Sequence, residues 1–311
     1  WVFIFVYIFA YCYCVNKNDT KMKTGKKHII LYVILLLLVL VSCSDRRTVI
    51  GVSQCSDDIW RQKVNREIKI GQYQYKNVDV VFASADNNGQ RQARQIDSLV
   101  KTKVDLLVVA PSDVKTVAPA IERAYRAGIP VILYDRMIES THYTAYIGTD
   151  NVAIGKEVAD YLAHQLQGRG TVVEITGERG STPVADRHRG FMQGMKAFPQ
   201  IQVVTLEGDW NLAGAKKLMR QYMDAGKPVD AVFGHNDAEA WGAQQAAKEK
   251  NRDKQMLFVG IDGLPGENQG VDLVDKGVMT ASYIYPTKGE AIVPLAMNIL
   301  QGKPYKRMNY F

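Results

Sequence analysis

The sequence has few cysteines, and most of them lie near one end. It contains four Cys in 311 residues, and Cys12, Cys14 and Cys43 all precede residue 44. Cys55 therefore has no partner in the rest of the chain, which excludes a disulfide framework and a cysteine-based metal site there. We expect Cys55 to be a small buried side chain.

The chain also lacks a strongly basic character once its first 42 residues are set aside. The formal net charge is +7, but five Lys and one Asp lie in residues 1–42, and the remainder carries 34 basic and 31 acidic residues. No run of Lys or Arg survives there that could follow a phosphate backbone. This charge distribution excludes nucleic acid as a partner.

Hydrophobic runs of membrane-spanning length are missing as well. The apolar run IILYVILLLLVLV has 13 residues and follows the basic stretch MKTGKKH, whereas a membrane-spanning helix needs roughly 20. A basic segment followed by a short apolar one is typical of a secretory signal. We therefore predict that residues 1–42 are a leader or anchor segment. Within it, residues 1–21 lack an initial Met and are interpreted as an upstream or fragment edge.

The end of this leader resembles a bacterial lipobox. Its residues are Leu40, Val41, Ser42 and Cys43, and in this interpretation Cys43 is acylated and begins the mature chain. A plain cleaved signal and an uncleaved anchor helix are the alternatives. At the other end, the chain stops at YKRMNYF without a finished strand, which is typical of a fragment of a longer protein.

From Thr48 onward, short β-branched runs alternate with stretches of helical periodicity. In residues 151–166, for example, Ile154, Val158 and Leu162 fall on one helical face. Apolar strands between amphipathic helices favour parallel sheets that are covered on both faces. The predicted strands are 48–53, 78–84, 105–110, 130–135, 144–148, 171–176, 201–206, 230–234, 256–261 and 278–284.

These strands are too many for one sheet in a chain of this length, and the natural break follows the fifth, near GTDN. We therefore predict an α/β protein with two Rossmann-like, doubly wound parallel-sheet lobes. Lobe 1 comprises residues 46–148 and 286–311, because the helix predicted at 289–302 is expected to pack back on the first sheet. Lobe 2 comprises residues 149–285.

Polar and aromatic side chains gather where the predicted strands end. Open α/β sheets bind ligands outside the carboxyl ends of their strands. Carboxylates and guanidinium groups can hold neighbouring hydroxyls by charge-assisted hydrogen bonds, and an indole face can cover the C–H surface of a sugar ring. The set is therefore suited to a polyol. Its members are Asp57, Asp58, Trp60, Asp135, Arg136, Arg187, Trp210, Asn236, Asp237, Asp262 and Tyr285.

Several residues at or near these strand ends have a structural alternative. Asp150, Asn151 and Asp237 stand where helices begin and could cap them. Asp135 and Arg136 could form a structural ion pair. The other residues with a structural alternative are Trp60 and Trp210 as core aromatics, and His235 as a side chain that faces away from the edge.

The ordered set ILYDR, GTDN, DRHRGF, GDWN, FGHNDAEAWGA and VGIDG resembles the type I periplasmic binding proteins of the ribose-binding and lactose-repressor-like superfamily. The match runs from about Thr48 to Lys303. The resemblance implies two Rossmann-like lobes, joined by a three-stranded hinge, that close on one sugar. We expect no enzyme and no cofactor, because metal-ligand spacing, an activated nucleophile and a Gly-rich phosphate loop are all missing from the sequence.

The resemblance also assigns ligand-binding residues by position. Three positions depart from the ribose-binding pattern: Asp57 and Ala110 stand where asparagines are found, and Tyr285 replaces a glutamine. These departures argue against ribose but leave a monosaccharide. The assigned ligand-binding residues are Asp57, Trp60, Asp135, Arg136, Arg187, Trp210, Asn236, Asp262 and Tyr285.

The leader, the unfinished end and the sugar-binding pattern together look like the periplasmic sensor half of a hybrid two-component system. Some such sensors bind fructose, which makes fructose the preferred ligand. The alternative is a lipoprotein that delivers its sugar to an ABC transporter. A related DNA-binding repressor is rejected because the export signal takes the place of its helix-turn-helix. The expected location is the periplasm, anchored to the membrane. The expected partners are a monosaccharide, the membrane, a kinase domain in cis or an ABC permease, and a second copy in a homodimer.

Overall fold

The structure is a computed structural model that describes residues 46–311; the predicted leader, including the lipobox Cys43, lies outside the described residues. Thr48–Phe311 form one compact unit. In chain order its elements are β1 (Thr48–Gln54), α3 (Ile59–Gln72), β2 (Val78–Ser84), α4 (Gly89–Lys101), β3 (Leu106–Val109), α5 (Ala118–Arg126), β4 (Val131–Tyr134), β5 (Ala145–Gly148), α6 (Asn151–Gln165), β6 (Arg169–Thr176), α7 (Thr182–Met195), β7 (Gln200–Glu207), α8 (Leu212–Asp224), β8 (Ala231–Gly234), α9 (Asp237–Glu249), η2 (Asp253–Gln255), β9 (Leu257–Asp262), α10 (Gly270–Asp275), β10 (Ala281–Ile284), η3 (Gly289–Ala291), α11 (Ile292–Leu300) and β11 (Met308–Tyr310).

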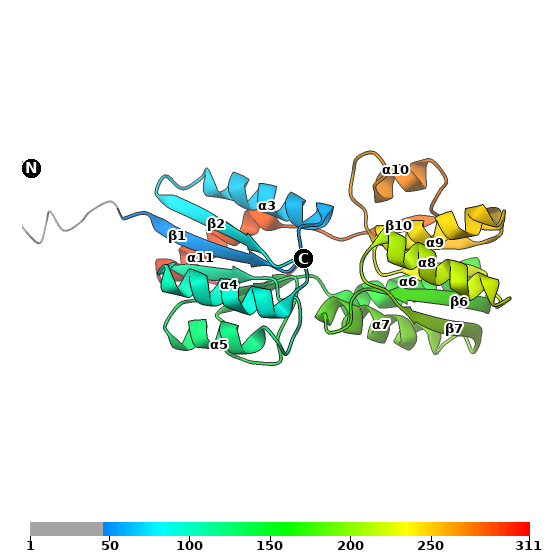
Figure 1. Cartoon of the computed structure of the whole chain (residues 1–311), viewed down its shortest axis with the longest axis horizontal. Coiled ribbons are helices and arrows are strands. Elements are labelled where there is room, and N and C mark those ends of the chain that lie inside the picture. Colours follow the sequence, from blue (N-terminus) through cyan, green and yellow to red (C-terminus); the bar gives the residue numbers. More distant parts are fainter. Residues whose placement is uncertain (1–45) are drawn as a thin grey trace, which may run out of the picture. The chain divides into compact units, whose positions relative to one another are not determined.

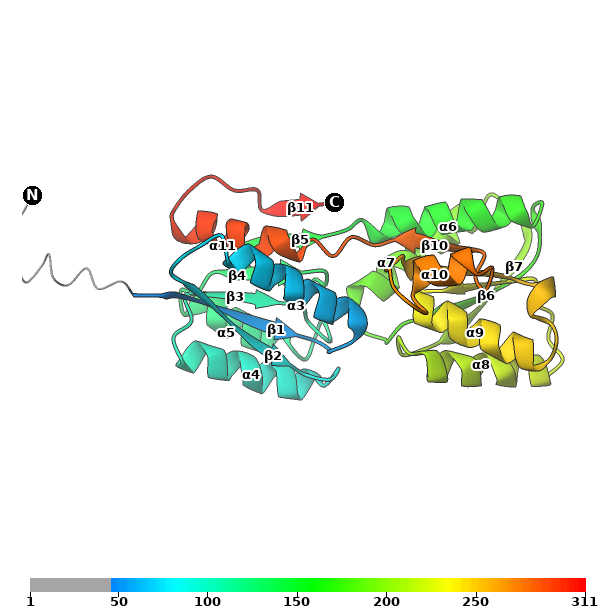
Figure 2. The same ribbon diagram turned by 90° about the horizontal axis from the view of Figure 1, so that it is seen from above.

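The strands form two separate parallel sheets, each flanked by helices (Figures 1 and 2). The first sheet has the order β11-β5-β4-β3-β1-β2, and the second has the order β10-β9-β8-β6-β7. In both sheets the first strand of the lobe, β1 or β6, lies inside the sheet with later strands on one side and the next strand on the other. This order reversal creates a crevice at the carboxyl end of each sheet, where open α/β folds bind ligands.

Strand β3 shows why both faces of the first sheet are covered. Leu106 and Val108 pack in one core cluster with residues of α3 and α11, whereas Leu107 and Val109 pack in another with residues of α4 and α5. Successive side chains of a strand point to opposite faces, so a continuous apolar run requires a helix layer on each side. The predicted α/β class with two doubly wound parallel-sheet lobes is confirmed. Cys55 is buried and unpaired, also as predicted.

The last strand was not predicted. Met308–Tyr310 form β11, which pairs in parallel with β5 and places Met308 beside Tyr146. The expectation that YKRMNYF contains no finished strand was therefore wrong. A three-residue strand is too short to show the alternation of side chains by which strands are recognised in a sequence.

Two connections join the lobes within the described residues. The chain leaves the first sheet after β5 at Thr149–Asp150, and it returns after β10 through residues 285–288, since α11 packs on α3. The three-stranded hinge that the resemblance implies stays a prediction. Below, lobe 1 denotes residues 46–148 and 286–311, and lobe 2 denotes residues 149–285, as predicted from the sequence. No helix in residues 46–311 is long and apolar enough to cross a membrane.

Candidate ligand-binding site

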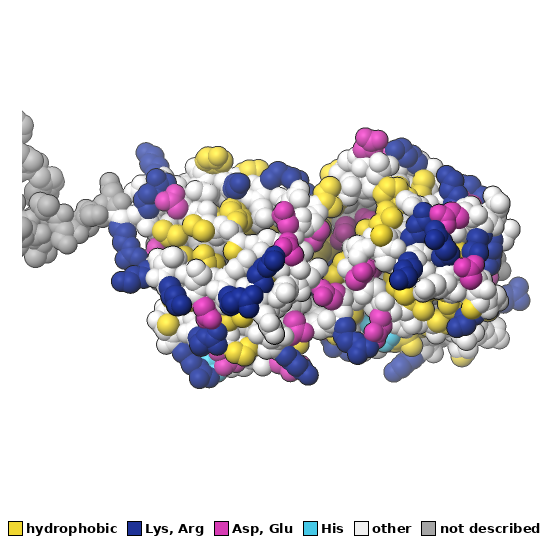
Figure 3. Space-filling model, viewed as in Figure 1, with side chains coloured by type: hydrophobic (Ala, Val, Ile, Leu, Met, Phe, Trp, Pro, Cys, Tyr) yellow, Lys and Arg dark blue, Asp and Glu magenta, His cyan; other side chains and the backbone are white. Residues whose placement is uncertain are grey.

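A cavity of about 220 Å³ lies between lobe 1 and lobe 2, next to the carboxyl ends of β4, β8 and β9. The space-filling view shows the surface hollowed between the two lobes, with acidic and hydrophobic side chains around the hollow (Figure 3). The predicted residues that line the cavity are Trp60, Asp135, Arg136, Arg187, Trp210, Asn236, Asp262 and Tyr285.

The structure does not bring Asp57 to this cavity. Asp57 is exposed and is not part of the lining, whereas the next residue, Asp58, is. Asp58 is the N-cap of α3, and its Oδ1 accepts a hydrogen bond from the Arg61 backbone N–H at 2.9 Å. The helix start therefore places Asp58, and not Asp57, in the cavity lining, so this geometry does not support the ligand contact predicted for Asp57.

Asp135 follows strand β4 directly and is buried in the cavity wall. Its carboxylate contacts the Arg61 guanidinium and accepts a hydrogen bond from the Tyr285 hydroxyl at 2.7 Å, while Arg136 Nε is 3.8 Å away. Burial alone would raise the pKa of Asp135. The charges of Arg61 and then Arg136 outweigh burial and hold this pKa below its ordinary value. Asp135 is thus an ionised carboxylate whose main partner is Arg61 and not its neighbour in sequence.

Arg136 points into a different set of contacts. Its Nη1 donates to the carbonyl oxygens of Pro111 and Ser112 at 3.4 and 3.3 Å. Its Nε is buried without a hydrogen-bond partner in residues 46–311. The predicted acid–arginine pair therefore exists as two neighbours with separate anchors, and Arg136 keeps an unused donor beside the cavity.

Arg61 is the site residue that the sequence reasoning missed. It lines the cavity, it is buried, and its Nη1 lacks a partner within the part of the chain that the structure describes. A basic residue in the first turn of a helix opposes the helix dipole, and this was the signal that could have identified it. Other lining residues outside the predicted ligand set include Asp237, Trp241, Asn268 and Gln269.

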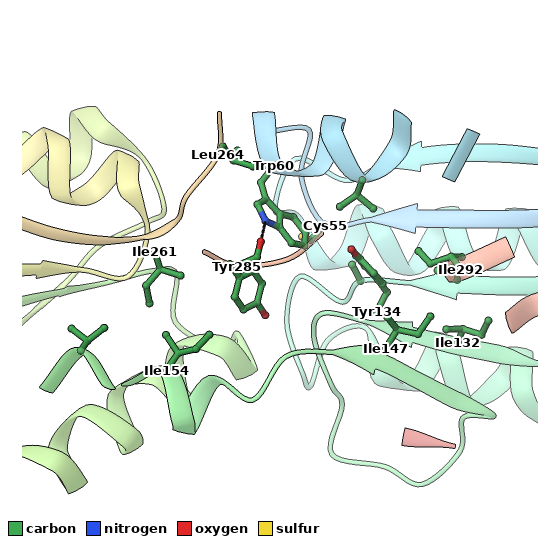
Figure 4. Packing of buried hydrophobic residues seen from close by; sticks show 14 of the residues in the cluster. Cys55, Trp60, Ile132, Tyr134, Ile147, Ile154, Ile261, Leu264, Tyr285 and Ile292 are labelled. Carbon is green, nitrogen blue, oxygen red and sulfur yellow. Dashed lines mark hydrogen bonds between the residues drawn. The ribbon is translucent and has the colours of Figure 1, made fainter. Parts of the chain in front are cut away.

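Trp60 and Tyr285 bring the two lobes together at one side of the cavity (Figure 4). The Trp60 indole N–H donates to the Tyr285 carbonyl oxygen at 3.4 Å, and the two ring centroids are 5.6 Å apart. Trp60 is only 8% exposed and also packs in the lobe 1 core. It is therefore both a core aromatic and a cavity wall, so its two predicted roles are compatible.

Arg187 projects from α7 between two aromatic rings. Its Cζ lies 4.6 Å from the centroid of Tyr285 and 5.6 Å from that of Trp210. The guanidinium also donates from Nε to Asn151 Oδ1 at 2.8 Å and from Nη1 to the His235 carbonyl oxygen. A guanidinium fixed in this way is a rigid cationic wall for a small ligand.

Three of the predicted structural alternatives can be decided. Asp150 caps α6, because its Oδ1 accepts from the N–H groups of Val152 and Ala153, each at 3.0 Å. Helix α9 is capped by Asn236 rather than by Asp237. His235 is fully buried and its Nε2 lies 3.0 Å from Glu174 Oε1, in keeping with its structural alternative.

Asp237 and Asp262 form an acidic pair at the lobe 2 side of the cavity. Asp237 is tied down by the Ser282 hydroxyl at 2.6 Å and the Gly263 N–H at 2.9 Å. Burial, and next the charge of Asp237, raise the pKa of Asp262 well above its ordinary range. Burial likewise raises the pKa of Asp237. The low-dielectric surroundings thus favour one protonated carboxyl over two full charges.

Gly177 provides the seat for Trp210. A Cβ atom at Gly177 would lie 2.1 to 2.3 Å from the Cε2, Cδ2 and Cζ2 atoms of the Trp210 indole. We predict that Gly177→Ala displaces this indole and lowers the free energy of unfolding by about 1–3 kcal/mol, the usual effect of overpacking. Urea unfolding and the near-ultraviolet circular dichroism of the Trp bands measure both effects. The control is Ala225→Gly at the end of α8. Gly226→Ala is unsuitable as a control because the φ of Gly226 is +69°. Ala240→Gly is unsuitable because it would disrupt buried α9.

As a whole, the site offers three guanidinium groups, several carboxylates and three indoles around a small cavity. Within residues 46–311, no group of three or more His, Cys, Asp and Glu is placed to hold a metal ion. This arrangement of donors, acceptors and apolar ring faces can hold a small neutral molecule with several hydroxyl groups.

Comparisons with known proteins agree with this geometry. The fructose-binding periplasmic domain of a hybrid two-component system is 44% identical, with a TM-score of 0.83 over 85% of this chain and 89% of that one. The galactofuranose-binding protein YtfQ of Escherichia coli K12 is 29% identical over 226 residues, 70% of this chain and 71% of that protein.

A third relative is the xylitol-binding protein of Mycolicibacterium smegmatis, which is 30% identical over 203 residues. That alignment covers 65% of this chain and 57% of the xylitol-binding protein, so this chain spans less than two thirds of the length of that relative. The family model described as a periplasmic binding protein domain matches residues 50–304. The chain therefore belongs to the family of periplasmic binding protein domains.

Proposed function

We propose that this protein binds one monosaccharide, preferably fructose, in the cavity between its two lobes in the periplasm. The observation that carries the proposal is the convergence of Arg61, Asp135 and Arg136 from lobe 1 with Arg187 and Asp262 from lobe 2 on one cavity. The cavity volume is about 220 Å³, whereas sites for drug-sized ligands measure roughly 300–1,000 Å³. The smaller volume suits a ligand of one sugar ring. The 44% identity to a fructose-binding periplasmic domain favours fructose.

Binding between the lobes would signal by stabilising the closed arrangement. A ligand shifts a conformational equilibrium only through its differential affinity for the two states. A sugar held by residues of both lobes meets this condition, because its contacts to one lobe are lost when the lobes separate. The lobes already touch beside the cavity, where the Val114 N–H donates to the Gly180 carbonyl at 3.2 Å and the Met137 N–H donates to Thr182 Oγ1 at 2.9 Å.

We propose the sensor domain of a membrane-bound hybrid histidine kinase as the context of this signal. The similarity to a domain of a hybrid two-component system supports it. The membrane anchor, the lipid on Cys43, a kinase domain in cis and a homodimer belong to the same proposal. The sugar is released unchanged, and the described region carries no enzymatic step in this proposal.

A substrate-binding lipoprotein that delivers sugar to an ABC permease is the second candidate. It is favoured by similarity to ribose import binding proteins, one of which, from Bacillus subtilis strain 168, is 29% identical over 189 residues. Both candidates share the cavity and its ligand, and they differ in the partner that recognises the closed lobes.

Calorimetry tests the ligand. We expect one-to-one binding of D-fructose with a micromolar dissociation constant, and at least tenfold weaker binding of ribose, xylose, glucose and galactose. Tight binding of another of these sugars would keep the sugar site but replace fructose. Absence of heat with all five, from a folded sample, would contradict monosaccharide binding.

A further inference from the structure

Trp210 has an unusual backbone. It lies in the loop between β7 and α8, directly before the α8 N-cap Asn211, and its φ is +68°. Non-glycine residues rarely adopt this left-handed region, and holding one there costs of order 1–3 kcal/mol. Such a conformation persists only where the surrounding contacts impose it.

The N-terminus of α9 imposes it from both sides of the residue. The Trp210 N–H donates to Glu239 Oε1 at 2.9 Å, and the Trp210 carbonyl oxygen accepts from Asn236 Nδ2 at 3.0 Å. Asn236 Oδ1 in turn accepts from the Glu239 N–H at 2.8 Å. In an ordinary capping box the acid at this helix position bonds back to the cap residue. Here it reaches a different loop.

The burial of Glu239 at this position costs folding free energy. Glu239 is fully buried, and its Oε2 has no hydrogen-bond partner among the residues that the structure describes. Burial raises the pKa of its carboxyl well above the ordinary range. A buried acid with one unsatisfied oxygen destabilises the fold unless its other contact is worth the cost. That other contact is the backbone of Trp210.

The indole that is fixed in this way forms part of the cavity wall. One face rests on Gly177, where any Cβ would collide with the ring, and the ring centroid is 5.8 Å from Arg136 Cζ and 5.6 Å from Arg187 Cζ. Trp210 is therefore set among the guanidinium groups of both lobes. A small rotation of the Trp210 backbone would move the ring away from Gly177, Arg136 and Arg187.

We infer that Glu239 is a positioning residue of the ligand site, which sets the orientation of Trp210 through its backbone and so determines how well the cavity fits its ligand. The inference rests on the proposed function for its ligand and on the contacts above for its mechanism. Asn236 shares this role, because its amide oxygen caps α9 and its amide nitrogen holds the Trp210 carbonyl. The sequence had predicted a direct ligand contact for Asn236 instead.

The first test needs no ligand. In the full chain labelled with ¹⁵N, the Trp210 indole resonance is assigned by its loss in Trp210→Phe. Glu239→Ala should shift this resonance, and Glu239→Gln, which keeps an acceptor oxygen, should restore it. The control is Glu249→Ala at the exposed end of the same helix, which should leave it in place. An unshifted resonance in a folded Glu239→Ala protein would overturn the inference, whatever the ligand is.

The second test uses D-fructose and a double-mutant cycle. Glu239→Ala and Trp210→Ala should each weaken binding about ten- to hundredfold, and the double variant should bind no more weakly than Trp210→Ala alone. Additive losses would mean that Glu239 does not act through Trp210. If Glu239→Ala does not fold, Glu239→Met fills the same space without an acceptor and replaces it in both tests. If the unaltered chain does not bind fructose, the proposed ligand fails, and the resonance test still decides the inference.

Discussion

Asp135→Ala should lower the free energy of unfolding by about 3–5 kcal/mol, because it leaves the buried Arg61 guanidinium without its counter-ion. The same change removes the acceptor of the Tyr285 hydroxyl. Urea unfolding of the variant at neutral pH measures the loss. Binding of fructose, measured in the same sample where it remains folded, should weaken by at least 2–3 kcal/mol.

A surface ion pair provides the matched control. Asp97→Ala removes the partner of Arg123, whose Nη2 lies 2.8 Å from Asp97 Oδ2 on exposed side chains, and it should cost at most about 1 kcal/mol. If the two variants lose similar stability, Asp135 is not a buried anchor. The pH dependence gives a second check. Because the folded-state pKa of Asp135 is lowered, its contribution is present above the ordinary value of 3.8 and is lost as the pH falls through the folded-state pKa.

Asp262→Asn should have the opposite effect on stability. Burial and the neighbouring Asp237 raise the pKa of Asp262, so the unaltered protein loses stability as the pH rises from 3.8 through the folded-state pKa. A neutral amide removes this penalty. We expect the variant to be more stable at pH 7 by about 1–3 kcal/mol, the range for an incompletely compensated buried group. We expect its affinity for fructose to fall, since residues kept at such a cost serve binding.

Thermal unfolding of both proteins between pH 4 and pH 8 tests this prediction. The difference between Asp262→Asn and the unaltered protein should grow with pH and vanish at the acidic end. Asp272→Asn is the control in the same lobe, because Asp272 is paired with Lys276 at 2.6 Å on the surface and its pKa is lowered. A variant that is less stable than the unaltered protein at pH 7 would contradict the assignment of a strained acidic pair.

Much of the site could be predicted because strand ends are a local property of the sequence. Asp135 and Asn236 closely follow apolar strands and Asp262 ends one, and parallel strands end on a common edge. Arg187 belongs to the same set although it lies on a helix, because that helix follows the end of β6. Asp57 lies outside the cavity lining because the N-cap of α3 falls on Asp58, and a sequence places a helix start only to within one or two residues.

The partners of these residues could not be predicted in the same way. The structural alternative for Asp135 was an ion pair with Arg136, yet its main contact is with Arg61, which is 74 positions away in the sequence. Arg61 could not be identified from the sequence, because a single arginine in an amphipathic helix is ordinarily a solvated side chain. Glu239 carries no distinguishing signal in the sequence, because the helix dipole favours an acid in the first turn of any helix.

The sequence by itself determined the α/β class, the two lobes and the edge at which a ligand can bind, because apolar periodicity and strand order are encoded by near neighbours. Only the tertiary structure decided which charges are paired, which acid keeps its proton and which backbone is held in a left-handed turn. Those properties depend on burial and on contacts between distant segments, such as Trp210 with Glu239 and Asp135 with Arg61. Charge interactions inside a folded protein are strong only where water is excluded, and the packing of the two lobes sets where that is.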